Sequence, residues 1–152
     1  YFCKVSLETG FNTLKISALE QLSSLKDRKK NTVTRLTRSS KIFKTIIQAI
    51  LDKKGENVIS LDLKKVHEAA ADFFIICEAN NTTQLKAIAD YIDYEVKHKC
   101  DDLPYKTEGK QGGQWLLIDY INVVVHVMHP EARGFYKLEE LWSDADMKTH
   151  ED

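Results

Sequence analysis

The segment at residues 115–128 constrains the fold of this chain more than any other. It holds two apolar stretches, 115–119 and 123–128, joined by a short connection. Four of the six residues in the second stretch are valines, and β-branched residues favour strands. Two such stretches so close together predict an antiparallel hairpin. The segment is 14 residues long and contains Asp119 and His126, so it falls short of the ~20 apolar residues of a membrane helix. We expect no membrane-spanning segment.

The rest of the chain supplies helices and strands to flank this hairpin. Residues 72–78 read DFFIICE, a short apolar run typical of a strand buried on both faces. Apolar side chains at three- and four-residue steps predict helices at 42–51 and 85–96. Ser39 or Ser40 suits the start of the first helix, and Gly55 suits its end. We also expect strands at 57–61 and 105–107, a polar connection at 64–70, and a last helix at 135–142.

This order of elements predicts an α/β fold, specifically an α+β mixed sheet of about five strands flanked by helices. Strands and helices do not alternate regularly enough for a doubly wound nucleotide fold. A chain of 152 residues corresponds to one domain and can bury a core of its own.

Charge divides the chain into unequal parts. Residues 1–37 hold seven basic and three acidic residues, whereas residues 38–152 hold fifteen basic and twenty acidic ones. We interpret 1–37 as a basic N-terminal extension, either disordered or derived from an upstream start, 38–145 as the folded domain, and 146–152 as a frayed acidic tail. The overall net charge of -1 argues against a bulk nucleic-acid binder, and we expect no direct DNA binding.

The sequence gives weaker evidence about the cellular compartment and about catalysis than about the fold. The three cysteines form no C-x-x-C pair, and no secretory signal is evident, so we expect a reducing, cytoplasmic setting. Cys77 and His126 could meet as a nucleophilic pair, but an apolar strand suits a buried, inert thiol. The spacing of His126, His129 and Glu131 does not match a zinc motif, and the Gly-rich residues 108–114 lack the P-loop pattern. We therefore expect no metal and no cofactor.

The hairpin also carries the strongest candidate for a binding surface. Alternation along its strands separates a valine-rich face, which belongs in the core, from a face with larger and more polar side chains. The second face is expected to hold Trp115, Tyr120, Val124, His126 and Met128, with Asp119 at its edge. Aromatic and methionine side chains beside a charge are typical of protein interfaces. A helix of the same chain could equally cover this face.

Several segments, in order along the chain, resemble one known family. The matching segments are Ala71 to Ile76, Gln84 to Asp90, Glu108-Gly109, Trp115 to Tyr120, Val123 to Val127, and Arg133 to Trp142. Together they cover about residues 40–145 and resemble the Iojap-like family of ribosomal silencing factors. Each motif is modest alone, and the ordered set is specific.

The resemblance implies a translational repressor, not an enzyme. Members of the family bind the large ribosomal subunit through large-subunit ribosomal protein fourteen, block association with the small subunit, and lower translation when nutrients are scarce. A homodimer is also plausible for the free protein. The resemblance carries Trp115, Asp119, Tyr120 and His126 over as partner-binding residues. Alternation adds Val124 and Met128. Arg133 and Tyr136 match the family motif, although they could instead dock the last helix.

The sequence departs from the family at two turns, and two other functions stay open. Ala79 and Ile121 stand where the family usually has glycine, so both turns could be reshaped. The family fold is similar to that of nucleotidyltransferases, which hold two metals with paired carboxylates. Here Asp119 stands alone, so an enzyme using Asp119 and a metal is the weaker alternative. A scaffold or dimerisation module is the third.

Overall fold

The computed structural model describes residues 35–66, 69, 71–109 and 113–151. The basic extension proposed for residues 1–37 lies outside the described part up to residue 34. The elements, in chain order, are α2 (Lys41–Asp52), β1 (Glu56–Asp62), β2 (Phe73–Glu78), α3 (Thr82–Cys100), β3 (Lys106–Glu108), β4 (Trp115–Asp119), β5 (Val123–Met128), α4 (Pro130–Tyr136), α5 (Leu138–Leu141) and β6 (Asp146–His150). None of the described helices is long and apolar enough to span a bilayer.

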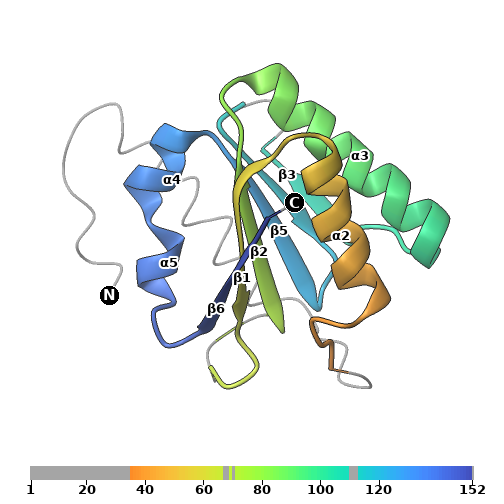
Figure 1. Ribbon diagram of the computed structural model, residues 1–152, viewed down its shortest axis with the longest axis vertical. Coiled ribbons are helices and arrows are strands. Elements are labelled where there is room, and N and C mark those ends of the chain that lie inside the picture. The colour runs from red at the N-terminus through yellow and green to blue at the C-terminus, as the bar shows by residue number, and fades with distance from the viewer. Residues whose placement is uncertain (1–34, 67–68, 70, 110–112, 152) are drawn as a thin grey trace.

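The strands form one six-stranded mixed sheet in the order β3-β4-β5-β2-β1-β6, which confirms the predicted fold class (Figure 1). β2 runs parallel to β5, and every other neighbouring pair is antiparallel. β4 and β5 form the predicted hairpin, with Leu117 opposite His126. β2 lies between β5 and β1, and five of its six residues are buried, as its apolar sequence predicts.

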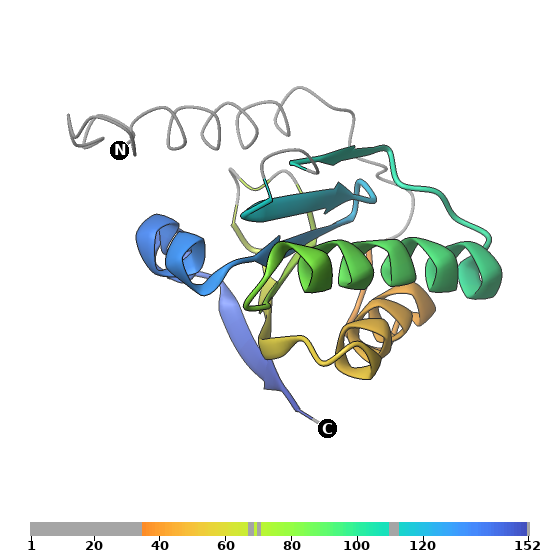
Figure 2. The same ribbon diagram turned by 90° about the horizontal axis from the view of Figure 1, so that it is seen from above.

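One face of the sheet is covered by α2 and α3, which lie side by side (Figure 2). Side chains from both helices meet the inward residues of the strands in what we call the α2/α3 core. Its members are mostly aliphatic, and Ile46, Ile88 and Val125 have no exposed surface. α3 begins where the Asn81 side chain accepts a hydrogen bond from Gln84 N at 2.8 Å, the expected N-cap chemistry.

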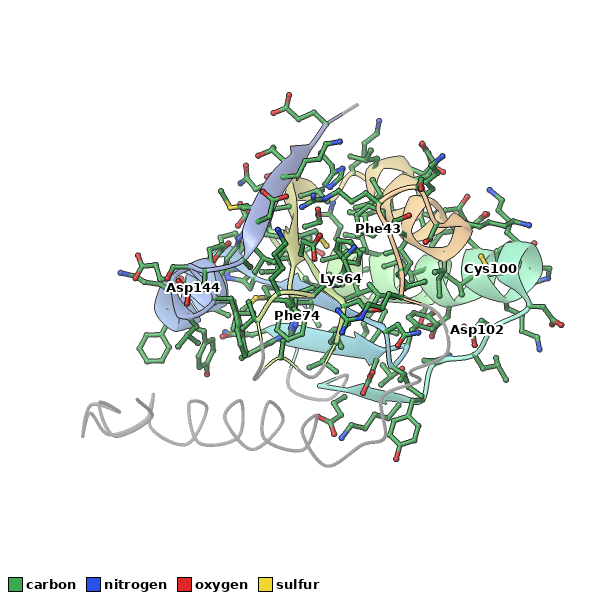
Figure 3. The ribbon with its side chains drawn as sticks, turned by 90° about the horizontal axis from the view of Figure 1, so that it is seen from below. Phe43, Lys64, Phe74, Cys100, Asp102 and Asp144 are labelled. Atoms are coloured by element: carbon green, nitrogen blue, oxygen red, sulfur yellow. The ribbon has the colours of Figure 1, made fainter. Side chains whose placement is uncertain are left out.

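The opposite face is covered by α4, α5 and the segment before β2. Together with the sheet they enclose a second group of side chains, the α4/α5 core, which includes Phe74, Trp115 and Leu138. Figure 3 shows the two cores in one view: Phe43 lies in the α2/α3 core and Phe74 in the α4/α5 core. The sheet is therefore sandwiched between two helical layers, and each layer excludes water from one face.

The structure corrects the expected ends of the domain. The segment predicted to be a frayed tail forms β6, which pairs with β1 along all five of its residues. Arg38 fixes this strand by donating to Asp146 Oδ2 at 3.0 Å and to the Asp146 carbonyl at 2.9 Å. At the other end, Leu36 N donates to the buried Asp72 carboxylate at 3.1 Å. The folded unit therefore includes residues 36–150, wider than the predicted 38–145.

The last helix is also divided differently from the prediction of one helix at 135–142. Pro130 occupies the first helical position of α4, where its missing N–H costs nothing. Lys137 then adopts a left-handed conformation with a φ of 47° and separates α4 from α5. The break lets the chain turn and keep both short helices against the sheet.

Candidate functional site

The hairpin face proposed as a binding surface has the predicted alternation, with one exception. Trp115, Val124, His126 and Met128 all point to the α4/α5 side of the sheet. Tyr120 does not, because it packs in the α2/α3 core and its hydroxyl donates to Asp93 Oδ1 at 3.0 Å. Burial, followed by the nearby Asp93 carboxylate, raises the pKa of Tyr120.

Of the two alternatives considered for this face, an outward-facing patch or a face covered by a helix of the same chain, the structure shows the covered face. Val124, His126 and Met128 are fully buried, Asp119 is fully buried, and Trp115 and Tyr120 are 7% and 6% exposed. α4, α5 and the segment before β2 cover the side chains that sequence alternation left open. An apolar face of this size is unfavourable in water, and the C-terminal helices of the same chain shield it. These side chains support a surface but do not themselves form it.

A hydrogen-bonded aromatic pair lies at the centre of this covered face. Trp115 Nε1 donates to His126 Nδ1 at 3.0 Å, so the neutral imidazole carries its proton on Nε2. Phe74 meets the imidazole edge-to-face with ring centroids 4.6 Å apart. Nε2 has no hydrogen-bond partner among the described residues. Burial lowers the pKa of His126 to about 3, so the ring is uncharged at neutral pH.

Asp119 has a specific role at the tip of the hairpin. Its Oδ1 accepts a hydrogen bond from Ile121 N at 2.7 Å. Ile121 adopts a φ of 74°, which is rare for a β-branched residue, and Asn122 N donates back to the Tyr120 carbonyl at 2.9 Å. The hairpin turn at Ile121, where the family usually has glycine, is therefore formed without one. Ala79 needs no glycine either, since its φ is not positive.

Arg133 joins α4 to the strands beneath it. Its guanidinium donates to Glu139 Oε1 at 2.8 Å and to the Asn57 carbonyl at 2.6 Å, and lies 3.6 Å from Glu78 Oε2. The Arg133 side chain is 13% exposed, as is that of Glu78. Of the two roles considered for Arg133, the structure supports docking of the C-terminal helices.

Tyr136 marks the place where the α4/α5 core reaches the surface. It is half-buried, and its ring centroid lies 4.8 Å from that of Trp115 and 5.1 Å from that of Phe135. Gln114, next to Trp115, is exposed. We call Phe135 and Tyr136, together with the exposed Gln114, the aromatic rim; the buried Trp115 ring lies beneath it. The aromatic rim is the accessible margin of the α4/α5 core.

The residues considered for catalysis or metal binding do not come together. Cys77 lies in the α2/α3 core and His126 on the opposite face of the sheet. Burial raises the pKa of the Cys77 thiol to about 12, so it is not a thiolate at neutral pH. His129 accepts a hydrogen bond from Glu131 N at 3.2 Å at the start of α4. No three potential metal ligands gather anywhere in the described ranges. The Gly-rich segment lies partly outside those ranges, at residues 110–112.

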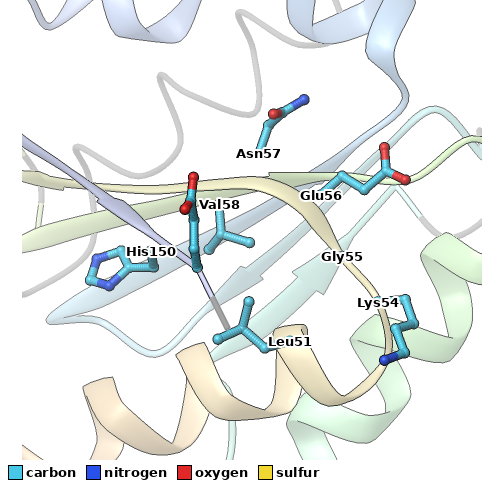
Figure 4. A pocket seen from close by; sticks show the side chains of 8 residues that line it. Leu51, Lys54, Gly55, Glu56, Asn57, Val58 and His150 are labelled. Carbon is cyan, nitrogen blue, oxygen red and sulfur yellow. The ribbon is translucent and has the colours of Figure 1, made fainter.

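Two surface hollows are lined by described residues. One, of about 310 Å³, lies between the end of α2 and the strands β1 and β6 (Figure 4). His150 lines it, but its Nε2 is hydrogen-bonded to Ser60 Oγ at 2.9 Å, and burial, followed by Lys148 and Arg38, lowers its pKa. The other, of about 330 Å³, lies between the end of α3 and the hairpin tip. Neither hollow places a nucleophile beside a free base among its lining residues.

The structural roles of two residues, Asp72 and Arg38, were not predicted from the sequence. Asp72 is 1% exposed and accepts the hydrogen bond from Leu36 N, and its own N donates to the Asn122 carbonyl at 2.8 Å. Arg38 holds β6, as described above. The position of Asp72 at the start of an apolar strand was a usable signal, because an aspartate is rarely buried without partners. Nothing in the local sequence around Arg38 points to residue 146.

Comparisons with known proteins agree with one another. The family described as "Ribosomal silencing factor during starvation" matches residues 36–152. The ribosomal silencing factor of Bacillus subtilis is 38% identical over 109 residues, which cover 70% of this chain and 88% of that protein. The counterpart in Halalkalibacterium halodurans is 36% identical and covers 70% and 90%. A mouse protein named for mitochondrial assembly of the ribosomal large subunit is 42% identical over 74 residues, 47% of this chain and 32% of that one.

Solved structures show the same relationship. A crystal structure from Chromobacterium violaceum aligns with a TM-score of 0.64 at 34% identity, covering 67% of this chain and 83% of that one. One from Bacillus halodurans aligns with a TM-score of 0.59 at 35% identity, covering 73% and 97%.

Proposed function

Because the chain belongs to the ribosomal silencing factor family, we propose that it binds the large ribosomal subunit and sterically blocks its association with the small subunit. The contact is made through large-subunit ribosomal protein fourteen, and the outcome is repression of translation when nutrients are limited. The protein carries this out in the cytoplasm and without a cofactor.

The observation that carries the proposal is the extent of the family match. It begins at residue 36 and ends at residue 152, and within the described part of the chain it takes in everything from the hydrogen bond between Leu36 N and Asp72 through β6. The whole described domain therefore corresponds to the family's domain. Its charge supports the same partner, because residues 38–152 hold twenty acidic against fifteen basic residues and suit a basic ribosomal protein.

We assign the contact to the aromatic rim and to the adjacent surface of α4. Tyr136 is half-buried and can be reached from solvent, and the ring of Trp115 supports it from below at a centroid distance of 4.8 Å. Arg133 holds α4 in place. The other predicted positions act beneath this surface by shaping the hairpin: Asp119, Tyr120, Val124, His126 and Met128.

A steric role also fits what Asp119 does. Its carboxylate is fully buried and accepts the Ile121 N–H, which shapes the hairpin tip. A two-metal nucleotidyl transfer needs carboxylates open to solvent and to the nucleotide. The alternative enzyme therefore has no support in the geometry, and we propose that the protein is not catalytic.

Co-sedimentation with purified large subunits tests the proposal. The purified chain should pellet with large subunits and reduce joining to small subunits, as seen in sucrose gradients. Tyr136→Ala should weaken both effects by about tenfold, because a truncated aromatic anchor typically costs more than 1 kcal/mol of binding. Pull-down from lysate should recover large-subunit ribosomal protein fourteen as the main partner.

Tyr94→Ala is the matched control. Tyr94 is a second tyrosine that solvent can reach, 56% exposed, but it lies on α3 and so on the other helical layer. It should leave ribosome binding unchanged. Equal loss in both variants, or full binding by Tyr136→Ala, would remove the aromatic rim as the contact. Failure of the unmodified chain to bind large subunits would reject the function itself.

A further inference from the structure

The hollow at the tip of the β4–β5 hairpin is a feature that the proposed function does not use. It has a volume of about 330 Å³ and lies between the end of α3 and the hairpin turn. We call it the tip hollow, and its lining residues are Asp102, Leu103, Tyr105, Tyr120, Ile121 and Asn122. None of these residues belongs to the aromatic rim, so the tip hollow is a separate surface.

Apolar side chains at the tip hollow are left in contact with solvent. Leu103 is 62% exposed and Tyr105 is 59% exposed. They are two of the four large hydrophobic side chains that are exposed in the described part of the chain, and they line the same hollow. Grouped apolar exposure of this kind marks a binding surface more often than single exposed side chains do. The tip hollow therefore suits an occupant that brings apolar side chains.

Acidic side chains border the same hollow. Asp101 ends α3 in a left-handed conformation, and both Asp101 and Asp102 are exposed. Figure 3 shows Asp102 beyond the end of α3, at the edge of the molecule. The Tyr120 hydroxyl donates to Asp93, which adds a third carboxylate close by. None of the described lining residues is basic. An occupant with basic side chains beside its apolar ones is therefore complementary to this surface.

The N-terminal part of the chain joins the described domain next to this hollow. Leu36 N donates to Asp72 Oδ2 at 3.1 Å, and Asp72 N in turn donates to the Asn122 carbonyl at 2.8 Å. Asn122 lines the tip hollow, and its buried amide oxygen has no hydrogen-bond partner among the described residues. Residues 1–34 precede this point in the chain. The ten residues 25–34 can span about 35 Å when extended, so residues near 25 are within reach of the hollow.

The sequence of residues 22–30 has the composition that the hollow calls for. It reads LSSLKDRKK, with Leu22 and Leu25 followed by four basic residues and a single aspartate. The apolar side chains match the exposed Leu103 and Tyr105, and the basic run matches the acidic border. The charge of this segment, which has no assigned role, thus has a complement within the same chain.

We propose that residues 22–30 dock in the tip hollow of their own chain. Leu22 and Leu25 cover Leu103 and Tyr105, and the basic run lies against Asp101 and Asp102. Because the segment is tethered beside the hollow, its effective concentration is high and a modest contact area is enough. Docking withdraws the apolar surface of the hollow from other proteins.

Hydroxyl-radical footprinting of the full chain tests the docking. Tyr105 and Tyr94 are the same residue type and are 59% and 56% exposed, so the domain alone would have them modified at similar rates. Docking should slow the modification of Tyr105 relative to Tyr94 by about fivefold, which corresponds to a docked fraction of about 80%. Peptide mass spectrometry measures both rates in one sample. Equal rates in the unmodified chain would overturn the proposal.

Charge reversal within the segment identifies the part that docks. The double variant Lys29→Glu/Lys30→Glu should bring the modification rate of Tyr105 up to that of Tyr94, because it turns attraction to the acidic border into repulsion. Lys4→Glu/Lys15→Glu is the matched control, since it makes the same change in net charge outside residues 22–30. Tyr105 should stay protected in the control. Loss of protection in both double variants, or in neither, would contradict docking by residues 22–30.

A charge swap tests whether the two regions meet. Asp102→Lys alone should expose Tyr105, and Asp102→Lys combined with Lys29→Glu/Lys30→Glu should restore part of its protection. A triple variant that is no better protected than Asp102→Lys alone would reject the contact. Circular dichroism shows whether each variant keeps its fold. These measurements contain no ribosome, so their outcome is independent of the proposed function.

Discussion

The two faces of the sheet differ in the side chains that pack on them and in the length of the helices that cover them. The α2/α3 core is mostly aliphatic and lies under two helices of 12 and 19 residues. The α4/α5 core lies under helices of seven and four residues and contains the Trp115–His126 hydrogen bond. Two buried nitrogens of that core, His126 Nε2 and Trp142 Nε1, have no hydrogen-bond partner among the described residues.

We interpret this difference as a division of roles, in which the α2/α3 core stabilises the domain and the margin of the α4/α5 core supplies the recognition surface. Unpartnered buried donors each lower stability, and most cores avoid them. Among the described residues, the α2/α3 core has no such unpartnered buried nitrogen, and we expect it to be the more rigid of the two. The α4/α5 core retains aromatic and polar side chains, and its margin forms the aromatic rim. Four predictions test this comparison.

The largest expected effect comes from shortening side chains in the two cores. Ile88→Ala should cost about 4 kcal/mol of unfolding free energy, because α2, α3 and the sheet hold the cavity open. Leu138→Ala should cost about 2 kcal/mol, because the four-residue helix α5 can move into the space. Urea denaturation at pH 7 measures both. Equal losses would show that the two cores are equally rigid.

The second effect is acid sensitivity confined to the α4/α5 core. The pKa of His126 is about 3 in the folded chain and 6.5 when unperturbed, so its contribution is complete above pH 6.5 and is lost as the pH falls towards 3. Between pH 7 and pH 5 the loss should be roughly 2 kcal/mol. His126→Phe should flatten this part of the stability curve in chemical denaturation. His150→Gln is the control. If the unfolding free energy of this variant, and not that of His126→Phe, no longer changed between pH 7 and pH 5, the effect would belong to β6.

The third effect concerns the attachment of the short helices. Arg133→Met removes the contacts to Glu78, Glu139 and the Asn57 carbonyl while keeping a long apolar stem, and should cost about 1.5 kcal/mol. Hydrogen exchange should quicken in α4 and α5 and stay unchanged in α2 and α3. Uniform quickening in all four helices would mean that the two layers unfold as one unit.

The smallest effect is a gain. Ile121→Gly should raise the unfolding free energy by about 1 kcal/mol, because glycine adopts a φ of 74° without steric cost. Asn122→Gly, one residue along and without a positive φ, should not stabilise. Thermal unfolding of the two variants compares them. A loss in Ile121→Gly would show that the Ile121 side chain contributes more by packing than its backbone costs.

Regular elements were predictable wherever apolar periodicity and end signals agreed. The isoleucines of α2, the apolar spacing of α3 and the valines of β5 all point to the structure that forms. The side of the sheet on which each hairpin residue lies also followed from alternation, except for Tyr120. Alternation could not show what covers a face. That depends on α4 and α5, two short helices whose placement is set by the left-handed turn at Lys137 between them.

β6 and the division at Lys137 were not predictable for a related reason. The sequence DMKTH has no apolar alternation, because both of its faces lie in solvent. It becomes a strand through the open edge of β1 and through Arg38, which is 108 positions away. Likewise Lys137 adopts its left-handed φ because α4 and α5 must both reach the sheet, and no local residue preference demands it.

The pairing of β6 with β1 has a consequence for how the protein is made. β1 ends at Asp62, and its outer partner is completed only at His150. During synthesis from the N-terminus, the outer edge of β1 therefore stays unpaired until residues 146–150 have left the exit tunnel. The sheet is completed only after residues 35–145 have been made, and a chain truncated at residue 145 would retain an adhesive edge throughout its lifetime.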